Sequence, residues 1–243
     1  MADRVIVEIL VAAPIETVWK AVKDPAEARR WFGWDYPNLA DDLVGMWSGN
    51  RADDENHVLH ADPMPDRFKL EALGAHTIVR IIRSAPAEDP SWHGIYDDLA
   101  EGWLTFMQQL KFALERHPGE ERRTIFLNGR AKQAGDPDPI TALGLAKLWV
   151  TPVGEAYDAK MSTGEHANGI VWYRSGNQLG LTVKGFGDGL LIFNVRPKTE
   201  KSLHGGGTIT LTTYGVDDAT FQQMRQRWSE WWSRTYEVIE IQP

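Results

Sequence analysis

Apolar residues in the first half of the chain alternate at first and then recur at helical spacing. Val5, Val7, Ile9 and Val11 occupy every second position, which predicts a half-buried strand. Pro14 then opens a predicted helix, since its missing N–H costs nothing in the first turn. The apolar positions of that helix are Ile15, Val18, Trp19 and Val22. A second short helix is expected to start at Asp24-Pro25.

From Leu43 to Arg83 the pattern changes to short runs that turn residues separate. The expected strands are Leu43–Ser48, Asn56–Ala61, Arg67–Ala72 and His76–Arg83. A long amphipathic helix follows, from Asp89-Pro90 to His117-Pro118-Gly119, and spans about seven turns. Its apolar stripe consists of Trp92, Tyr96, Leu99, Trp103, Phe106, Leu110 and Ala113.

The second half of the chain repeats this order of elements. Ile125 and Leu127 share one face of a strand, and a helix is expected from Asp138-Pro139 to Leu148. The next strands are Glu155–Met161, Ile170–Arg174, Gln178–Lys184, Leu190–Val195 and Thr208–Tyr214. A last helix starts at Val216-Asp217-Asp218, with the stripe Phe221, Met224, Trp228, Trp231 and Thr235. We expect only one of the adjacent Trp231 and Trp232 to face inward.

The repeated plan predicts an α+β fold made of two tandem modules. Each would be a curved antiparallel sheet around a long C-terminal helix, the arrangement called helix-grip. The expected domains are residues 1–118 and 123–243, because the charged segment 120–123 between them is typical of an exposed linker. Gly185–Gly189 has three alternate glycines between two strands, which favours a hairpin turn over a nucleotide-binding loop.

The first half also resembles the START-like superfamily, also called SRPBCC. The resemblance rests on Ala13-Pro14-Ile15-Glu16-Thr17-Val18-Trp19 and on a closing helix with Tyr96, Gly102-Trp103-Leu104 and Leu110-Lys111. That helix is similar to the Hsp90-ATPase-activator-homologue (AHSA1-like) branch. The match covers roughly residues 4–116, whereas the second half shares only the order of elements.

The resemblance implies a helix-grip fold whose sheet and long helix enclose a hydrophobic cavity. Members of the superfamily bind lipids, sterols, polyketides or other apolar molecules. Some are cyclases or dehydratases, and one branch stimulates the Hsp90 ATPase. Since these proteins share no catalytic residue, the resemblance assigns none to this chain.

Composition narrows the partners further. A net charge of −8 over 243 residues argues against nucleic acid, which requires many lysine and arginine contacts to phosphate. The absence of cysteine excludes disulfides and thiolate metal sites. We expect a cytoplasmic protein, because the sequence lacks a signal-peptide pattern and an apolar run of about 20 residues. It carries no motif for a cofactor. The acidic residues and histidines between 53 and 62 are interpreted as a solvated loop and not as a metal site.

The 11 tryptophans suggest an aromatic-lined cavity, although each one alone is also consistent with ordinary core. His76 and His93 are candidates for proton transfer if both face the cavity, and Arg80 for pairing with a ligand carboxylate. All three are equally consistent with surface residues. The ligand-binding candidates are Trp31, Trp34, Trp47, His76, Arg80, Trp92, His93, Trp103, Trp172 and Trp228.

Three functional hypotheses follow. The first is a protein that binds a small hydrophobic or aromatic molecule, with no assignable reaction. The second is a polyketide cyclase or dehydratase-like enzyme, which would use His76, His93 or Asp97 for proton transfer. The third is an interaction protein with a protein partner, such as a regulator of the chaperone Hsp90. Whether the chain is an enzyme stays open at this point.

Overall fold

The computed structural model describes residues 3–62, 64–84, 93–199 and 203–239, with the side chains of 93–99 outside the description. The chain divides into two compact units, Met1–Glu121 and Arg122–Pro243. No helix in the described ranges has the length and apolar character required to cross a bilayer.

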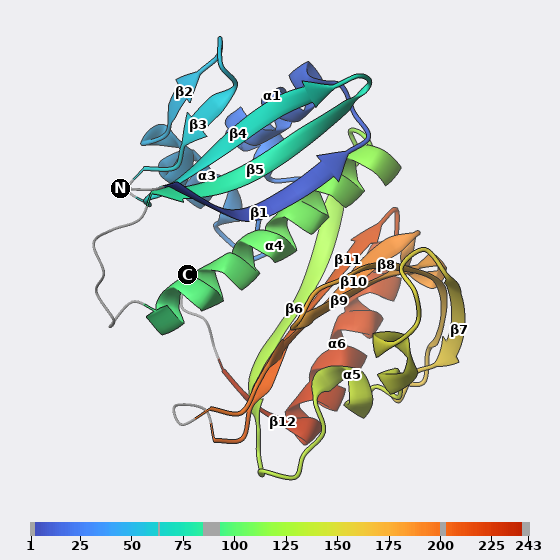
Figure 1. The fold of residues 1–243 in the computed structure, drawn as a ribbon. Helices are drawn as coiled ribbons and strands as arrows, with labels where there is room; N and C mark the ends of the chain where they lie inside the picture. The colour runs from blue at the N-terminus through green and yellow to red at the C-terminus, as the bar shows by residue number, and fades with distance from the viewer. Residues whose placement is uncertain (1–2, 63, 85–92, 200–202, 240–243) are drawn as a thin grey trace. The chain divides into compact units, whose positions relative to one another are not determined.

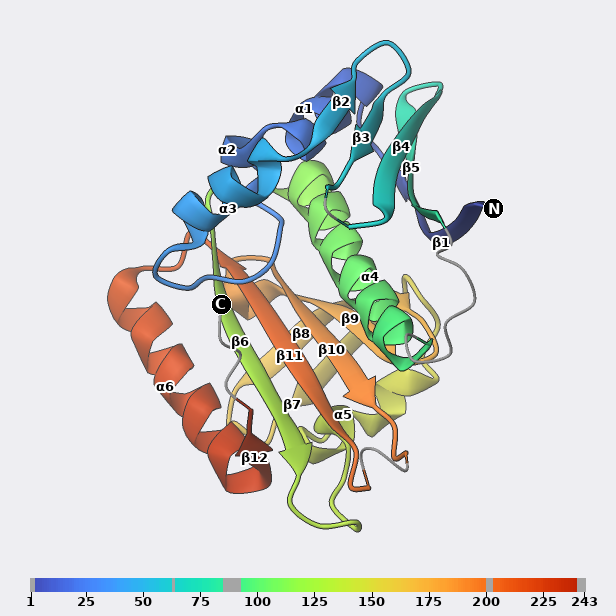
Figure 2. The same cartoon turned by 90° about the vertical axis from the view of Figure 1, so that its left-hand side faces the viewer.

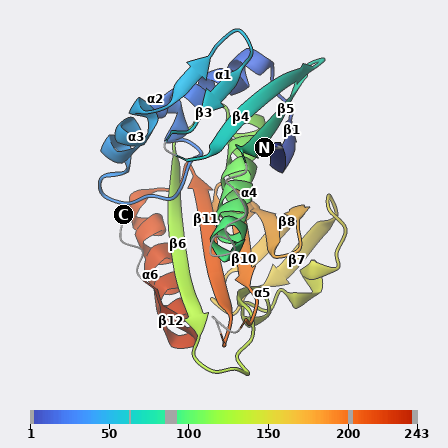
Figure 3. The same ribbon diagram turned by 60° about the vertical axis from the view of Figure 1, so that its left-hand side comes forward.

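The first unit contains one five-stranded antiparallel sheet with the order β1-β5-β4-β3-β2. Its strands are β1 (Asp3–Val11), β2 (Arg51–Asp53), β3 (Val58–His60), β4 (Asp66–Leu73) and β5 (His76–Ser84). Its helices are α1 (Ile15–Lys23), α2 (Pro25–Ala28), α3 (Leu39–Ser48) and α4 (His93–Arg116). The long helix α4 runs along the sheet beside β1 (Figure 1). Helices α1, α2 and α3 follow one another next to β3 and β4 (Figure 3).

One face of this sheet forms the core of the first unit. Val79 and Ile81 on β5 are fully buried against Met107 and Leu110 of α4 and the side chains of α1. The alternation of side chains along β5 places Arg80 on the other face. The core therefore lies between the sheet and α4, as the helix-grip arrangement requires.

The second unit contains a seven-stranded antiparallel sheet with the order β12-β6-β11-β10-β9-β8-β7. Its strands are β6 (Arg122–Ala131), β7 (Ala156–Lys160), β8 (His166–Arg174), β9 (Gln178–Val183), β10 (Gly189–Arg196), β11 (Gly206–Tyr214) and β12 (Tyr236–Val238). Its helices are α5 (Pro139–Ala142), η2 (Ala146–Trp149), η3 (Lys184–Phe186) and α6 (Asp218–Thr235). Helix α6 follows the direction of β6 (Figure 2). Its residues Phe221, Met224 and Trp228 enter the core of this unit.

The predicted fold class is confirmed: both units are α+β, with a strand, short helices, an antiparallel sheet and a long helix in that order. The predicted hairpin at Gly185–Gly189 is also present. It joins β9 to β10, which pair antiparallel from Val183 and Gly189 onward.

Two predicted elements were wrong. The expected strand Leu43–Ser48 is part of helix α3, because Leu39, Leu43 and Trp47 are buried at intervals of four and form a helical stripe. The expected helix from Asp138 to Leu148 is broken into α5 and the short 3₁₀ helix η2. Gly144, with φ +86°, lies in the left-handed region between them and ends the first helix.

Two predictions about single residues at the ends of the second unit were also wrong. Arg122 is no linker residue but the buried first residue of β6. Trp231 and Trp232 are both buried in the same core. The chain folds back after α6 as β12, so that Tyr236 stacks on Trp232 with ring centroids 4.2 Å apart. The extra strand covers the second indole.

Candidate functional site

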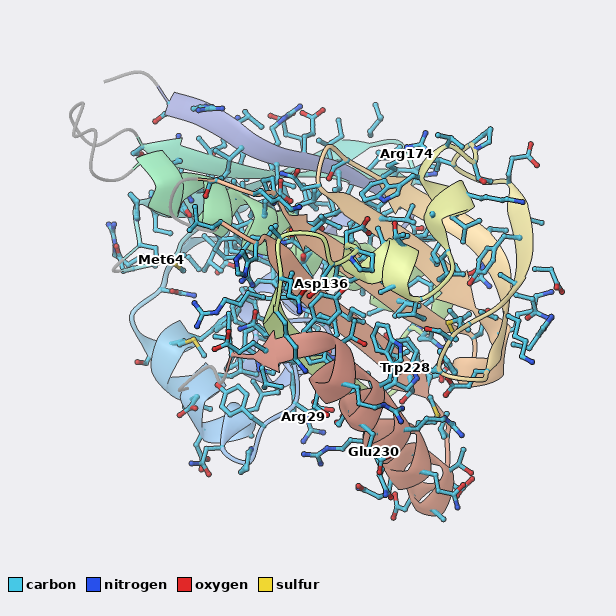
Figure 4. All side chains as sticks on the ribbon, turned by 90° about the horizontal axis from the view of Figure 1, so that it is seen from below. Arg29, Met64, Asp136, Arg174, Trp228 and Glu230 are labelled. Carbon is cyan, nitrogen blue, oxygen red and sulfur yellow. The ribbon has the colours of Figure 1, made fainter. Side chains whose placement is uncertain are left out.

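The first unit has a pocket of about 380 Å³ between α3, the turn from β3 to β4, and α4. Helix α3 and the two residues that follow it form one side, and Ala61, Asp62 and Met64 from the β3–β4 turn form the opposite side. Figure 4 labels Met64 in that turn. The remaining walls come from β4, α4 and the segment after α2. The lining residues are Phe32, Gly45, Met46, Trp47, Ser48, Gly49, Asn50, Ala61, Asp62, Met64, Phe68 and Trp103.

Four aromatic side chains line the pocket: Phe32, Trp47, Phe68 and Trp103. Phe32 meets Trp47 edge to face, with ring centroids 5.0 Å apart, and Phe68 meets Trp103 in the same way at 5.2 Å. Phe32 and Trp103 are 6.2 Å apart, so the four rings form one connected cluster. Edge-to-face pairs are the favoured geometry for such rings. The cluster therefore presents a rigid apolar surface to the pocket.

The indole N–H groups of this wall are used within the protein. Trp47 Nε1 donates to the backbone oxygen of Val22 at 2.9 Å, and Trp103 Nε1 donates to Asp66 Oδ2 at 2.7 Å. These bonds fix the orientation of both rings. They also leave the tryptophans with only their carbon surfaces for a ligand.

Asp66 belongs to a buried ion pair directly behind this wall. Its carboxylate accepts from Arg83 Nε at 2.6 Å and from Arg83 Nη2 at 2.8 Å, while the two side chains are only 1% and 7% exposed. Asp66 and Arg83 lie opposite each other on β4 and β5. A bidentate pair of this kind has high directional specificity. The strands of the sheet thereby hold Trp103, and with it α4, in a defined position.

Polar groups gather at the rim of the pocket. Asp62 pairs with Arg51 at 2.7 Å, and Ser48 Oγ donates to Gly45 O at 2.7 Å. Gly49 permits a close approach of the rim to the β3–β4 turn, since a Cβ there would lie 3.3 Å from Asp62 O. Asn50 follows directly, half-buried between the end of α3 and β2.

Two of the predicted ligand-binding residues, Trp47 and Trp103, line this pocket. Trp31 lies behind it in the core, 1% exposed, with its Nε1 donating to Ala21 O at 2.8 Å. Trp34 is half-buried and lies 6.5 Å from the ring of Phe106 on α4. Trp92 lies outside the described residues. The role of each in ligand binding stays a prediction.

The two polar candidates whose side chains are described, His76 and Arg80, do not line this pocket. His76 is exposed at the start of β5. Arg80 lies on the sheet face opposite to the core and pairs with Glu8 at 2.5 Å and with Glu71 at 2.6 Å. The bonds to Glu71 and Glu8 raise the pKa of the guanidinium. His93 begins α4, and its side chain is outside the description.

The two remaining candidates, Trp172 and Trp228, belong to the second unit and are not among the residues that line this pocket. Trp228 is fully buried in the core, and its Nε1 donates to Glu165 Oε1 at 3.1 Å. Arg227 pairs with the same carboxylate at 2.8 Å. Trp172 is half-buried on β8. Figure 4 shows Trp228 and the exposed Glu230 on opposite sides of α6.

The acidic segment between α3 and β4 uses its carboxylates for local contacts. Asp54 accepts from Lys23 at 2.5 Å and from Trp19 Nε1 at 2.7 Å, and these bonds lower the pKa of its carboxyl group. A hydrogen bond from Asn56 likewise lowers the pKa of Asp53. Within the described ranges, no three histidine or acidic side chains are grouped so that they could hold a metal ion.

The Asp66–Arg83 pair and the rim residue Asn50 were not among the residues predicted from the sequence. A signal for the pair existed in the hairpin around Gly74. A hairpin in which Leu73 pairs with His76 also pairs Asp66 with Arg83, seven residues further along each strand. The pairing brings two opposite charges together at the open end of the hairpin. Asn50 carried no such signal, because its place at the pocket depends on α3 being a helix.

Comparison with known proteins gives weak likenesses to solved structures only. No family model and no curated protein matches the chain. Among solved structures, it is similar to the di-domain ARO/CYC BexL from the BE-7585A biosynthetic pathway, with 13% identity and a TM-score of 0.37, over 97% of this chain and 96% of that one. The di-domain ARO/CYC StfQ from the steffimycin biosynthetic pathway has 14% identity and a TM-score of 0.33, over 94% and 91%.

A third likeness concerns half of the chain. The Aha1 dimer from Colwellia psychrerythraea has 19% identity and a TM-score of 0.32, covering 49% of this chain and 100% of that one. Likenesses of this strength carry no information about what this chain binds or does.

Proposed function

We propose that the first unit binds a small apolar or aromatic molecule in the pocket between α3 and α4. The observation that carries this proposal is the aromatic wall of Phe32, Trp47, Phe68 and Trp103 around a volume of about 380 Å³. Pockets of about 300–1,000 Å³ with mostly apolar walls and a few polar groups are typical of small-molecule sites.

The physical basis of affinity would be burial of apolar surface. Each Å² of apolar area removed from water contributes about 25 cal/mol. Preorganised walls further increase the affinity, because side chains that are already fixed lose little rotamer entropy on binding. The hydrogen bonds of Trp47 and Trp103 supply this fixation.

Binding is favoured over proton-transfer catalysis by the chemistry of the lining. Among the described residues that form the pocket, Asp62 is the one titratable side chain, and it pairs with Arg51. General acid–base catalysis requires a proton donor and acceptor within hydrogen-bond reach of the substrate. The described lining supplies no such pair, so the proposal includes no reaction.

The test is a blocked pocket in the full-length protein. Ser48 is exposed at the rim, so Ser48→Trp places a large side chain at the pocket without disturbing the core. We expect wild type to bind 2-naphthol in isothermal titration calorimetry and S48W to bind it at least tenfold more weakly. Ser48→Ala is the matched control and should bind as wild type does. Absence of binding to wild type, or equal binding by S48W, would overturn the proposal.

A further inference from the structure

We infer that Asn50 orients the bound molecule, and that this molecule is a neutral, compact aromatic compound with a hydroxyl or carbonyl group. The inference rests on the proposed binding function of the pocket. It adds the chemical class of the ligand and the residue that selects it.

Asn50 is placed to make this contact. It lines the pocket, is half-buried, and its backbone N–H donates to Trp47 O at 3.0 Å, which fixes the main chain at the end of α3. Its side-chain amide takes part in no hydrogen bond with another described residue. A carboxamide offers two N–H donors and an acceptor oxygen. Both kinds of group are therefore open to a ligand.

The other polar side chains of the lining have partners within the protein. The indole N–H groups of Trp47 and Trp103 bond to Val22 O and to Asp66, and the Ser48 hydroxyl donates to its own helix. Within the described lining, the Asn50 amide is thus the neutral donor that a ligand can engage. A hydroxyl or carbonyl on an otherwise apolar ligand would meet it at the rim, with the rings against the aromatic wall.

The charge at the rim selects against anions. Asp62 lines the pocket, whereas its partner Arg51 does not, and the Arg51 side chain is 70% exposed. A ligand carboxylate in the pocket would lie near the carboxylate of Asp62 with the compensating cation directed to solvent. Like charges at short range disfavour binding. A neutral polar group avoids this repulsion.

The volume of the pocket favours a compact ligand. The pocket volume of about 380 Å³ is near the lower end of the ~300–1,000 Å³ range of small-molecule sites. This suits a molecule of two or three fused rings. The edge-to-face rings of the wall present both faces and edges, so a flat aromatic ligand can pack against them in the favoured geometries.

The experiment compares two probes that differ in one polar group. In the full-length wild type we expect 2-naphthol to bind about fivefold to tenfold more tightly than 2-methylnaphthalene, since one neutral hydrogen bond contributes about 1 kcal/mol. Asn50→Leu should remove this preference while leaving the affinity for 2-methylnaphthalene within about twofold. The anionic probe 2-naphthoate should bind wild type more weakly than 2-naphthol.

Asn38→Leu is the matched control, because Asn38 is an exposed residue at the opposite end of the same helix and makes no side-chain capping bond. It should keep the preference for 2-naphthol. If wild type binds both neutral probes equally, the inference about Asn50 fails while the binding function stands. The inference fails likewise if N50L keeps the preference. If neither probe binds, the proposed function itself fails. The comparison of probes on wild type does not depend on the folding of any variant.

Discussion

At the scale of single residues, the contacts around Asp66 connect the sheet to the pocket. One carboxylate accepts two bonds from Arg83 and one from the Trp103 indole, and all three side chains are buried. Such a pair contributes little net stability compared with apolar residues, but removal of one partner leaves a buried, uncompensated charge. Asp66 is therefore interpreted as a positioning residue that holds an aromatic wall of the pocket.

We predict that Arg83→Met lowers the free energy of unfolding by about 3–5 kcal/mol, because it leaves the Asp66 carboxylate buried without its cation. Urea unfolding followed by tryptophan fluorescence measures this change. Arg67→Met is the control, since Arg67 is next to Asp66 on β4 and pairs with the half-exposed Asp3. Arg67→Met should lower the free energy of unfolding by no more than about 1 kcal/mol. Equal losses in the two variants would contradict the role of the buried pair.

At the scale of elements, the turn between β9 and β10 shows how one position can control a hairpin. Gly187 has φ +71°, and a Cβ there would lie 1.7 Å from Tyr214 O. Glycine is required here because it has no Cβ: it adopts the positive φ without strain and avoids the clash with Tyr214 O. Gly185, two residues earlier, has only ordinary contact distance around it, with His166 O at 3.9 Å. The glycine-rich segment is thus a structural turn in which the two glycines have different importance.

Gly187→Ala is predicted to lower the free energy of unfolding by at least about 2 kcal/mol, from the left-handed conformation and the steric conflict together. Gly185→Ala should change it by no more than about 0.5 kcal/mol. Thermal and urea unfolding of both variants provide the comparison. Similar stability of the two alanine variants would show that the β9–β10 turn does not require its left-handed glycine.

At the scale of the whole molecule, the described lining of the pocket comes entirely from the unit Met1–Glu121. The second unit has its own buried core around Trp228, Ile209 and Phe193. If ligand binding belongs to the first unit alone, a mild change in the second core should alter stability without altering affinity.

Ile209→Val tests this separation. Ile209 is fully buried on β11, and loss of one methylene from such a site costs about 0.5–1.5 kcal/mol. We expect a lower Tm and an affinity for 2-naphthol within about twofold of wild type at 25 °C, measured by calorimetry on fully folded protein. A clear loss of affinity would show that the pocket depends on the second unit.

The sequence by itself determined the main strands, the repeated plan and the two long helices, because these depend on local periodicity, on proline and glycine, and on the spacing of apolar residues. The sequence did not determine the secondary structure of the segment that forms α3. Leu39, Leu43 and Trp47 have helical spacing, but residues 43–48 alone were also compatible with a short strand.

The tertiary structure alone decided which face of β5 became core. Both faces of that strand are apolar, because they carry Ile78, Val79, Ile81 and Ile82, so periodicity could not place Arg80. The face with Val79 and Ile81 packs against α4, and Arg80 therefore lies on the opposite face. The same applies to the pocket. Asn50, Asp62, Phe68 and Trp103 are separated along the chain and meet only because β4, α3 and α4 pack together. Contacts of this kind depend on long-range burial, which no local pattern encodes.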